Sequence, residues 1–551
     1  MANRQYIGAR YVPKVFNNNG SSDWVSGIAY EPLTIVTLLG NSYTSVKPVP
    51  STIGSPNLNP QYWANTGNYN AGMANLQNEI DALDDRVDYL SNFVTPQMFG
   101  AKGDGSTDDT EAIKECFESD LKYVYIPLGN YLVTDTIEIP DGFVVRGEGT
   151  LISRSEYYPK VNVGNNCDVQ INVDEKMDSY SMPFDDHSNV IEINNKSNVI
   201  IRDCKVINVG SRFAIHGYQS TNITIVNCYV DTYVYGAICA NTSCDGVKIL
   251  HNTVLNGHGN AVNRYPIGVG GVTANSQICK NVIISDNYIE DDEPKWEGID
   301  SHGCVNLIIT NNVIKNCLTG IAVVKGANDV VSENVIVANN TYEFTKTGNF
   351  GDSNTFGISC EIHTNSNGVI IANNIIKQTG NNGSVTGAQG GMYIAGTATI
   401  IGNRILMNKG RGIYLVSTAT CVAKNFKICD NVLEGDGTAI AMKFNNTNLY
   451  DIIGEVYNNV IDNFETGIDG NEYYGSGSDY LNSVYCYQNT IVNVTNEILH
   501  NSRGTFLDHG ESRNRFMRRG QIIFNVGASS VSHWICTTSA TSESAAVVKE
   551  V

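Results

Sequence analysis

The stretch from Trp296 to His302 is dense in side chains that could do chemistry. It reads Trp-Glu-Gly-Ile-Asp-Ser-His, so an indole, two carboxylates and an imidazole fall within seven residues. Two carboxylates can act as acid and base at a glycosidic bond, and an imidazole beside them can tune a proton or bind an anion. The stretch predicts a glycan-cleaving site with Asp300 and His302 as catalytic residues and Trp296 and Glu297 as substrate-binding residues. The alternative is that these polar groups are merely solvated.

A second stretch, Gly357 to His363, again places polar residues after a glycine and an isoleucine. If the isoleucine of each stretch points into a core, strand alternation directs Asp300, Glu361 and the two histidines outward onto one face. Two coils of a stacked chain would separate the backbones of Asp300 and Glu361 by about 9.6 Å. Carboxyl pairs about 6.5–9.5 Å apart suit inverting hydrolysis, so Glu361 is predicted as the catalytic partner of Asp300. The further substrate-binding candidates on this face are His363, Tyr393, Tyr414 and His216.

Both stretches belong to a repeat that runs from about Val199 to Val494. Within each copy apolar and polar residues alternate, as in a half-buried strand, and a glycine–isoleucine step follows in most copies. Successive copies are 24 to 35 residues apart. This period predicts one coil of a parallel β-helix per copy, in which recurring asparagines stack and bond to one another at a turn. The copies centre on Cys204, Cys228, Asn252, Asn287, Asn312, Asn340, Asn374, Asn403, Asn431, Asn459 and Asn489.

The two longest spacings, 35 and 34 residues, lie just before Asp300 and around Glu361. Their extra residues, about 256–275 and 342–356, are predicted to precede the strands that carry these acids and to wall a groove. Binding residues are often found on such loops.

The bulk composition restricts the partners. The net charge of −20 argues against a nucleic-acid partner, because phosphate contacts need a basic face. No apolar window of about 20 residues exists, so no membrane span is expected, and no signal peptide follows Met1. The 14 cysteines include no C-x-x-C pair and are interpreted as small core residues. With no phosphate loop or zinc spacing, neither a metal nor a cofactor is predicted.

Four parts are predicted along the chain. Residues 1–70 form a small β module, 71–94 an oligomerisation helix, 95–500 the β-helix and 501–551 a terminal β module with a cluster of arginines. The helix carries a narrow apolar stripe at steps of three and four, which it cannot bury alone, so it predicts self-association. The alternative is a helix docked on its own chain. The stripe consists of Met73, Leu76, Ile80, Leu83, Val87 and Leu90.

Three further segments carry a family resemblance. Residues 99–109, 126–131 and 144–149 resemble the opening of the pectate-lyase-like β-helix superfamily, which includes phage tailspikes and preneck appendages. The resemblance implies an all-β, right-handed parallel β-helix in a homotrimer. It also implies a virion protein, assembled in the host cytoplasm, that binds and depolymerises a bacterial surface glycan such as teichoic acid or capsular polysaccharide. The open alternatives are a non-catalytic adhesin or structural spike and a polysaccharide lyase.

Two local features complete the predictions. The pattern from Gly40–Ser45 to Pro60–Trp63 resembles N-terminal modules of phage tail proteins, and implies attachment to tail, neck or baseplate proteins. Asp104, Asp108 and Asp109 precede an expected helix at residues 110–118, and are interpreted as caps and turn formers rather than as a catalytic or metal cluster.

Overall fold

The computed structural model describes residues 23–68, 93–153, 160–175, 189–258, 263–270, 278–325, 332–350, 355–361, 368–382, 389–418, 420–444, 453–469 and 483–499, and short strands beyond residue 500. The chain divides into two compact units, Met1–Phe93 and Val94–Val551. The predicted apolar stripe at 73–90 and the arginine cluster at 513–519 lie outside the described residues.

The first unit holds a three-stranded antiparallel sheet of β1 (Ile35–Leu38), β2 (Asn41–Ser45) and β3 (Trp63–Asn68), with the short 3-10 helix η2 (Pro56–Leu58) before β3. Its core gathers Tyr30, Tyr43 and Trp63, and the rings of Tyr30 and Trp63 meet edge to face at 5.2 Å. These aromatic residues pack inside the module, so they are not an exposed platform for sugars.

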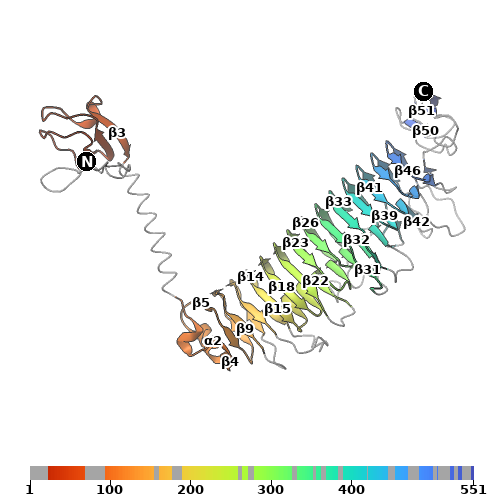
Figure 1. Ribbon diagram of the computed structural model, residues 1–551, viewed down its shortest axis with the longest axis horizontal. Helices are drawn as coiled ribbons and strands as arrows, with labels where there is room; N and C mark the ends of the chain where they lie inside the picture. The colour runs from red at the N-terminus through yellow and green to blue at the C-terminus, as the bar shows by residue number, and fades with distance from the viewer. Residues whose placement is uncertain are drawn as a thin grey trace, which may run out of the picture. The chain divides into compact units, whose positions relative to one another are not determined.

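The second unit is built from three long parallel sheets, whose strands are stacked along one axis (Figure 1). Sheet 1 consists of β7 (Ile137–Ile139), β10 (Val161–Val163), β13 (Asn189–Asn194), β16 (Phe213–Tyr218), β19 (Gly236–Asn241), β22 (Tyr265–Gly270), β25 (Glu297–His302), β28 (Thr319–Val324), β32 (Thr355–Glu361), β36 (Gln389–Ala395), β39 (Arg411–Ser417), β42 (Thr438–Phe444), β45 (Thr466–Asp469) and β48 (Asn496–Leu499). Sheet 2 consists of β5 (Tyr123–Tyr125), β8 (Val144–Arg146), β11 (Asp168–Val169), β14 (Ser197–Arg202), β17 (Thr221–Val226), β20 (Asp245–Leu250), β23 (Cys279–Ser285), β26 (Cys304–Thr310), β29 (Glu333–Ala338), β33 (Val369–Ala372), β37 (Ala398–Ile401), β40 (Phe426–Cys429), β43 (Ile453–Tyr457), β46 (Ser483–Tyr487) and β49 (Thr505–Phe506). Sheet 3 consists of β4 (Asp104–Asp108), β6 (Asn130–Leu132), β9 (Thr150–Ile152), β12 (Asn172–Asp174), β15 (Lys205–Val209), β18 (Tyr229–Tyr233), β21 (Thr253–Gly257), β24 (Tyr288–Glu290), β27 (Val313–Lys315), β30 (Thr341–Phe344), β34 (Ile375–Gln378), β38 (Arg404–Met407), β41 (Val432–Gly435), β44 (Val460–Asp462) and β47 (Thr490–Val492).

Each coil contributes one strand to each sheet in turn, as β16, β17 and β18 do. Equivalent residues pair from coil to coil, so Ile215, Ile238, Ile267 and Ile299 form one buried row. Such rows merge into one continuous apolar core from Val94 to Cys486. The predicted parallel β-helix is confirmed. Because residues far apart in sequence become neighbours, one face can collect chemistry from several coils.

The turn between sheets 2 and 3 contains the predicted asparagine ladder. From Asn252 to Asn489, each side-chain amide donates to the Oδ1 of the next asparagine at 2.9–3.0 Å. That Oδ1 also accepts the backbone N–H of the previous ladder residue. The residue before each ladder asparagine has a positive φ, as at His251 and Asn311, which suits asparagine, aspartate and glycine. The ladder therefore satisfies the buried polar groups of a sharp turn.

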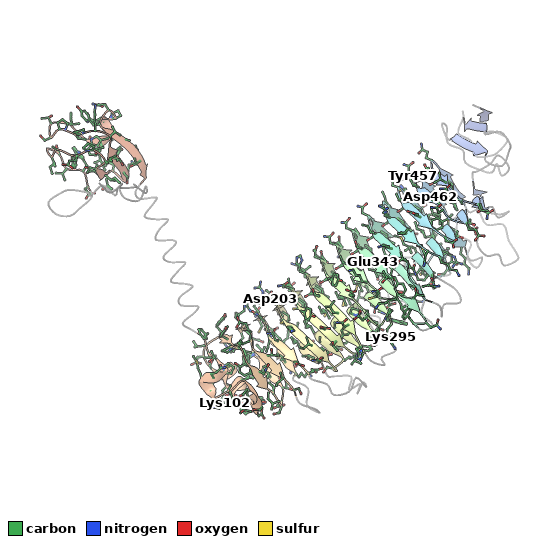
Figure 2. The ribbon with its side chains drawn as sticks, in the orientation of Figure 1. Lys102, Asp203, Lys295, Glu343, Tyr457 and Asp462 are labelled. Carbon is green, nitrogen blue, oxygen red and sulfur yellow. The ribbon has the colours of Figure 1, made fainter. Side chains whose placement is uncertain are left out.

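Side chains on the outer faces of the sheets also pair between coils. Glu343 of β30, labelled in Figure 2, forms an ion pair with Lys377 of the next coil at 2.8 Å. The cysteines whose surroundings are described are buried and unbridged, which fits their interpretation as small core residues.

The β-helix begins with a short helical segment at the position predicted from the sequence. The 3-10 helix η3 (Pro96–Phe99) leads into β4 and helix α2 (Thr110–Glu118). Asp109 accepts the backbone N–H groups of Lys102 and Gly103, and Asp108 accepts that of Thr110. Asp108 therefore caps the helix start, whereas Asp109 makes no side-chain cap bond and instead holds the preceding turn.

Two smaller sheets complete the second unit. The strands β31 (Thr347–Gly348) and β35 (Asn381–Asn382) pair with each other, and β50 (Ile522–Asn525), β51 (Ser532–Cys536) and β52 (Val548–Glu550) form an antiparallel sheet. Among the described residues, no helix has the length and apolar character needed to cross a membrane.

Candidate functional site

The outer face of sheet 1 carries the polar side chains singled out in the sequence. Asp300 pairs with Gly268 of the previous coil and Ala322 of the next, and His302 pairs with Gly270 and Val324. Ser301 between them is fully buried, as expected for a residue that points inward. Strand alternation therefore predicted the directions of Asp300 and His302 correctly.

Glu297 joins Asp300 on the same face because the chain bends where it enters sheet 1. A Cβ on Gly298 would meet Ile314 and Cys317, which belong to the core, and Ile299 is also in the core. Two consecutive residues thus point inward, and the pairing of β25 with β28 skips Gly298. This local kink turns two acids three residues apart toward each other, where a regular strand would place them on opposite faces.

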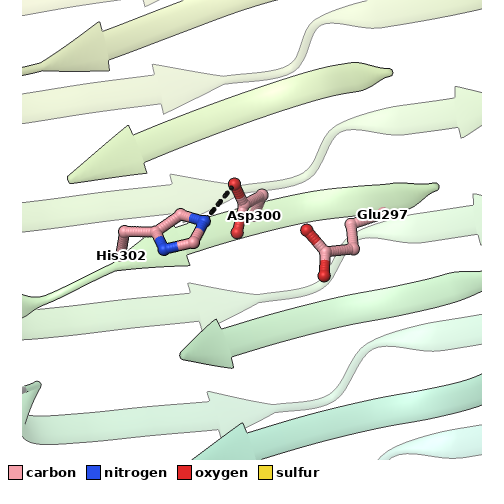
Figure 3. A group of neighbouring side chains, drawn as sticks. All are labelled: Glu297, Asp300 and His302. Atoms are coloured by element: carbon pink, nitrogen blue, oxygen red, sulfur yellow. Dashed lines mark ion pairs between the residues drawn. The ribbon is translucent and has the colours of Figure 1, made fainter. Parts of the chain in front are cut away.

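Glu297, Asp300 and His302 form a compact cluster, which we call the Asp300 cluster (Figure 3). Each offers one ligand atom, and these atoms lie within 4.8 Å of one another. His302 Nε2 lies 3.0 Å from Asp300 Oδ2, and His302 Nδ1 lies 3.2 Å from the carbonyl oxygen of Lys325. The side chain of His302 is 34% exposed and that of Asp300 only 6%, so the histidine is the accessible member.

The surroundings of the cluster favour the protonated forms of Glu297 and His302. Burial and the neighbouring Asp300 carboxylate raise the pKa of Glu297 well above its usual range. Burial lowers the pKa of His302, but its hydrogen bond to Asp300 and the charge of that carboxylate outweigh burial and raise the pKa to about 9. Asp300 Oδ1 and Glu297 Oε2 are buried without a hydrogen-bond partner among the described residues. A proton or a cation between the two carboxylates would satisfy both.

The residues that pair with Asp300 on the two neighbouring coils, Gly268 and Ala322, have small side chains or none. A Cβ on Gly268 would make only ordinary contacts, the nearest at 3.5 Å from the sulfur of Cys239. Tyr265 of the previous coil lies close enough that burial, and then the charge of Asp300, raise its pKa. The cluster therefore lies beside a ring with a polar hydroxyl group and beside side chains of minimal size.

The predicted pairing of Asp300 with Glu361 needs correction. Asp300 lies in the same row as Ala322 and Ser359, and Glu361 stands two residues further along β32. A shift of two coils, about 9.6 Å, and of two residues, about 6.6 Å, separates the two backbones by about 12 Å. The predicted separation of 9.6 Å was wrong because it left out the displacement along the strand. The catalytic role of Glu361 stays a prediction, and His363 lies outside the described residues.

The groove walls also differ from expectation. Residues 256–275 contain β22, a regular strand of sheet 1 that pairs directly with β25. Its entry step is Pro266–Ile267, so it does not show the glycine–isoleucine signal. The second segment, 342–356, contains β30 and β31, and β31 stands outside the three main sheets. The groove-wall role of both segments stays a prediction.

His216 belongs to a separate cluster on the same sheet. Its Nδ1 lies 3.1 Å from Glu192 Oε2, and its Nε2 lies 3.2 Å from Asn241 Oδ1. Its ring stacks on Phe213 at 5.1 Å, and the residue is 7% exposed. Both ring nitrogens are thus occupied, and the predicted substrate contact of His216 stays untested.

The aromatic candidates differ in exposure. Trp296 and Tyr393 are partly exposed. Tyr414 is 8% exposed and packs in a small apolar cluster with Val416 and Ala441. The geometry therefore favours Trp296 and Tyr393 as sugar platforms over Tyr414.

Comparisons with known proteins agree with the fold. Residues 93–348 match the family described as rhamnogalacturonase A/epimerase, pectate lyase-like, and residues 274–428 match the right handed beta helix region. A solved structure, the N-terminal fragment of gene product 12 of bacteriophage phi29, aligns with a TM-score of 0.50 at 16% identity. The alignment covers 76% of this chain and 74% of that one, and at this identity it shows a shared fold.

Sequence relatives match only short segments. The preneck appendage proteins of Bacillus phages PZA and phi29 are each 41% identical over 64 residues, which is 11% of this chain and 7% of theirs. A probable glucan endo-1,3-beta-glucosidase of Arthroderma benhamiae is 41% identical over 58 residues, 10% of this chain and 7% of its own. These short matches include both phage and fungal proteins, so they do not assign an activity to this chain. The chain is therefore a right-handed parallel β-helix protein whose residues 93–348 are similar to the pectate-lyase-like family.

Proposed function

We propose that this chain is a phage receptor-binding spike that binds a bacterial surface glycan on the outer face of sheet 1 and cleaves it at the Asp300 cluster. The observation that carries the proposal is the cluster itself, where two carboxyl groups and a partly exposed imidazole converge. The short likeness to phage preneck appendage proteins supports a place on the virion. Assembly in the host cytoplasm is part of the proposal.

The chemistry centres on Asp300. Glycoside cleavage needs one group that gives a proton to the leaving oxygen and another that activates a water or attacks the sugar. Asp300 and Glu297 supply these two groups, and His302 holds Asp300 in place through its 3.0 Å contact. Trp296 and Tyr393 offer aromatic faces on which sugar rings stack.

The assembly is part of the same proposal. The apolar stripe at 73–90 would join chains, with a homotrimer as the expected state, and the N-terminal module would attach them to tail, neck or baseplate proteins. Three chains would carry a net charge of 3 × −20 = −60, so acidic surfaces must face away from one another.

The proposal is tested by incubating the purified full chain with envelopes or isolated teichoic acid and capsular polysaccharide of candidate hosts. We expect released saccharides with new reducing ends, and a loss of about 100-fold or more with Asp300→Asn or Glu297→Gln. Glu434→Gln, on the outer face of sheet 3, is the matched control and should cleave normally. Glu361→Gln tests the partner predicted from sequence.

The outcomes separate the alternatives. Retained glycan that is never cleaved would identify a non-catalytic adhesin, and an unsaturated product absorbing in the ultraviolet would identify a lyase. If Asp300→Asn and Glu297→Gln both cleave at the wild-type rate, the assigned site is wrong.

A further inference from the structure

We propose that Glu297, Asp300 and His302 bind one divalent transition-metal ion of the class represented by Zn²⁺ and Mn²⁺. The inference concerns the site of the proposed function but does not require that a glycan be cleaved there. An ion held by both carboxylates would displace the proton that one of them gives in cleavage, so cleavage should fall as the ion binds. The three residues turn one ligand atom each toward a common point, with all three atoms within 4.8 Å of one another. One imidazole nitrogen with two carboxylate oxygens suits these ions, whereas Mg²⁺ and Ca²⁺ favour sites made of oxygen alone.

The histidine is held in the tautomer that a metal ligand needs. A carbonyl oxygen only accepts hydrogen bonds, so the contact of His302 Nδ1 with the carbonyl of Lys325 places a proton on Nδ1. A charged ring carries its second proton on Nε2 and donates it to Asp300 Oδ2 at 3.0 Å. A metal ion would take the place of that proton between the two atoms. Metal-binding histidines commonly donate their second N–H to a backbone carbonyl in this way.

The distances fit one ion. Two ligands each about 2.1 Å from an ion, at an angle of 90–110°, lie roughly 3.0–3.4 Å apart. His302 Nε2 and Asp300 Oδ2 already stand at 3.0 Å. Glu297 lies on the other side of Asp300 (Figure 3). The three ligand atoms lie within 4.8 Å of one another, so the Glu297 carboxyl group must move closer for all three to bind one ion.

Unpaired oxygens supply a second, independent reason for a ligand. The side chain of Asp300 is 6% exposed, yet its Oδ1 has no hydrogen-bond partner among the described residues. Glu297 Oε2 is likewise buried and unpartnered in that part of the chain. Leaving such oxygens without a partner is costly, and a cation shared between the two carboxylates removes the cost for both.

The second histidine–carboxylate cluster on sheet 1, around His216, offers a comparison. There Glu192 Oε2 is held by Asn189 and His216, and His216 Nε2 is held by Asn241. Both histidines thus have a partner at each ring nitrogen. Among the described residues, the Asp300 cluster differs in having a second carboxyl group within reach and an unpartnered oxygen on each carboxyl group.

The test uses the full chain after chelator treatment and dialysis. Calorimetric titration with Zn²⁺ and, separately, Mn²⁺ should show one ion per chain, and Co²⁺ should give visible absorption bands typical of nitrogen and oxygen ligands. Asp300→Asn and His302→Ala should each weaken binding at least tenfold. His251→Asn is the matched control, because His251 is exposed at a positive φ where other coils carry asparagine, and it should bind as wild type does.

Each outcome decides the inference. The absence of saturable binding of one ion would overturn it, and so would unchanged binding in Asp300→Asn and His302→Ala. If Asp300→Asn does not fold, judged by circular dichroism, Glu297→Gln and His302→Ala decide instead. Saccharide release, measured in parallel, separates the two proposals. Glycan cleavage without metal binding would refute only the metal site. Metal binding without glycan cleavage would refute only the proposed cleavage.

Discussion

Replacing Asn340 by alanine tests whether the asparagine ladder stabilises the solenoid. Asn340 Oδ1 accepts the backbone N–H of Asn312 at 3.0 Å and its side-chain amide at 2.9 Å. Asn340 Nδ2 donates to Asn374 Oδ1 at 3.0 Å and to the carbonyls of Ile309 and Ala338 at 2.9 and 3.0 Å. Alanine would remove all five contacts in the middle of the stack.

The size of the effect follows from the burial of the partners. The N–H of Asn312 would be left buried without an acceptor, which costs about 1–3 kcal/mol. The four remaining lost bonds add about 0.5 kcal/mol each, the low end for a hydrogen bond that water partly replaces, so the total loss is about 3–5 kcal/mol. Asn489, the last ladder member described, is only partly buried, and water can take over its contacts. Asn489→Ala should therefore cost about 1–2 kcal/mol.

Hydrogen exchange measures the loss of local stability around Asn312, and thermal unfolding measures the loss of global stability. In Asn340→Ala the amide of Asn312 should exchange at least about 100-fold faster than in wild type, because a 1.4 kcal/mol loss is a factor of ten. The amides of the first unit should not change. Equal unfolding midpoints for the two variants, or an unchanged Asn312 amide, would refute the reasoning.

Three other predictions use different parts of the chain. Glu175 is buried and its pKa is raised to about 7, so stability should fall by about 3 kcal/mol as the pH rises from 4.5 to 7; unfolding midpoints of Glu175→Gln should lack this fall. Asp291 pairs with the fully buried Arg264 at 3.0 Å, so Asp291→Asn should cost about 3–5 kcal/mol in thermal unfolding, and a loss under about 1 kcal/mol would contradict this. Deleting residues 73–93 should turn the oligomer into monomers in sedimentation experiments, and an unchanged oligomer would rule out the helix as its basis.

The sequence predicted the solenoid well because its signals repeat. The ladder asparagines, the αL residues before them and the alternating apolar rows all recur coil after coil, so chance agreement at one position mattered little. It missed β22 because Pro266 stands where other coils carry a small residue, and the strand was taken for part of a loop. The distance between Asp300 and Glu361 could have been improved from sequence alone, since the two acids follow their isoleucines by one and three residues.

Glu297 shows what strand periodicity could not predict. Acids three residues apart on a regular strand point to opposite faces, so its contact with Asp300 depends on the kink at Gly298. The same spacing recurs in β13, where Val190 and Ile191 both point inward and Asn189 Nδ2 bonds Glu192 Oε2 at 2.5 Å. Because two strands four coils apart bring residues at this spacing into contact, the kink is a property of how each coil enters sheet 1. Polar residues that flank an inward pair at the start of such a strand should therefore be treated as neighbours when sites are sought in related β-helices.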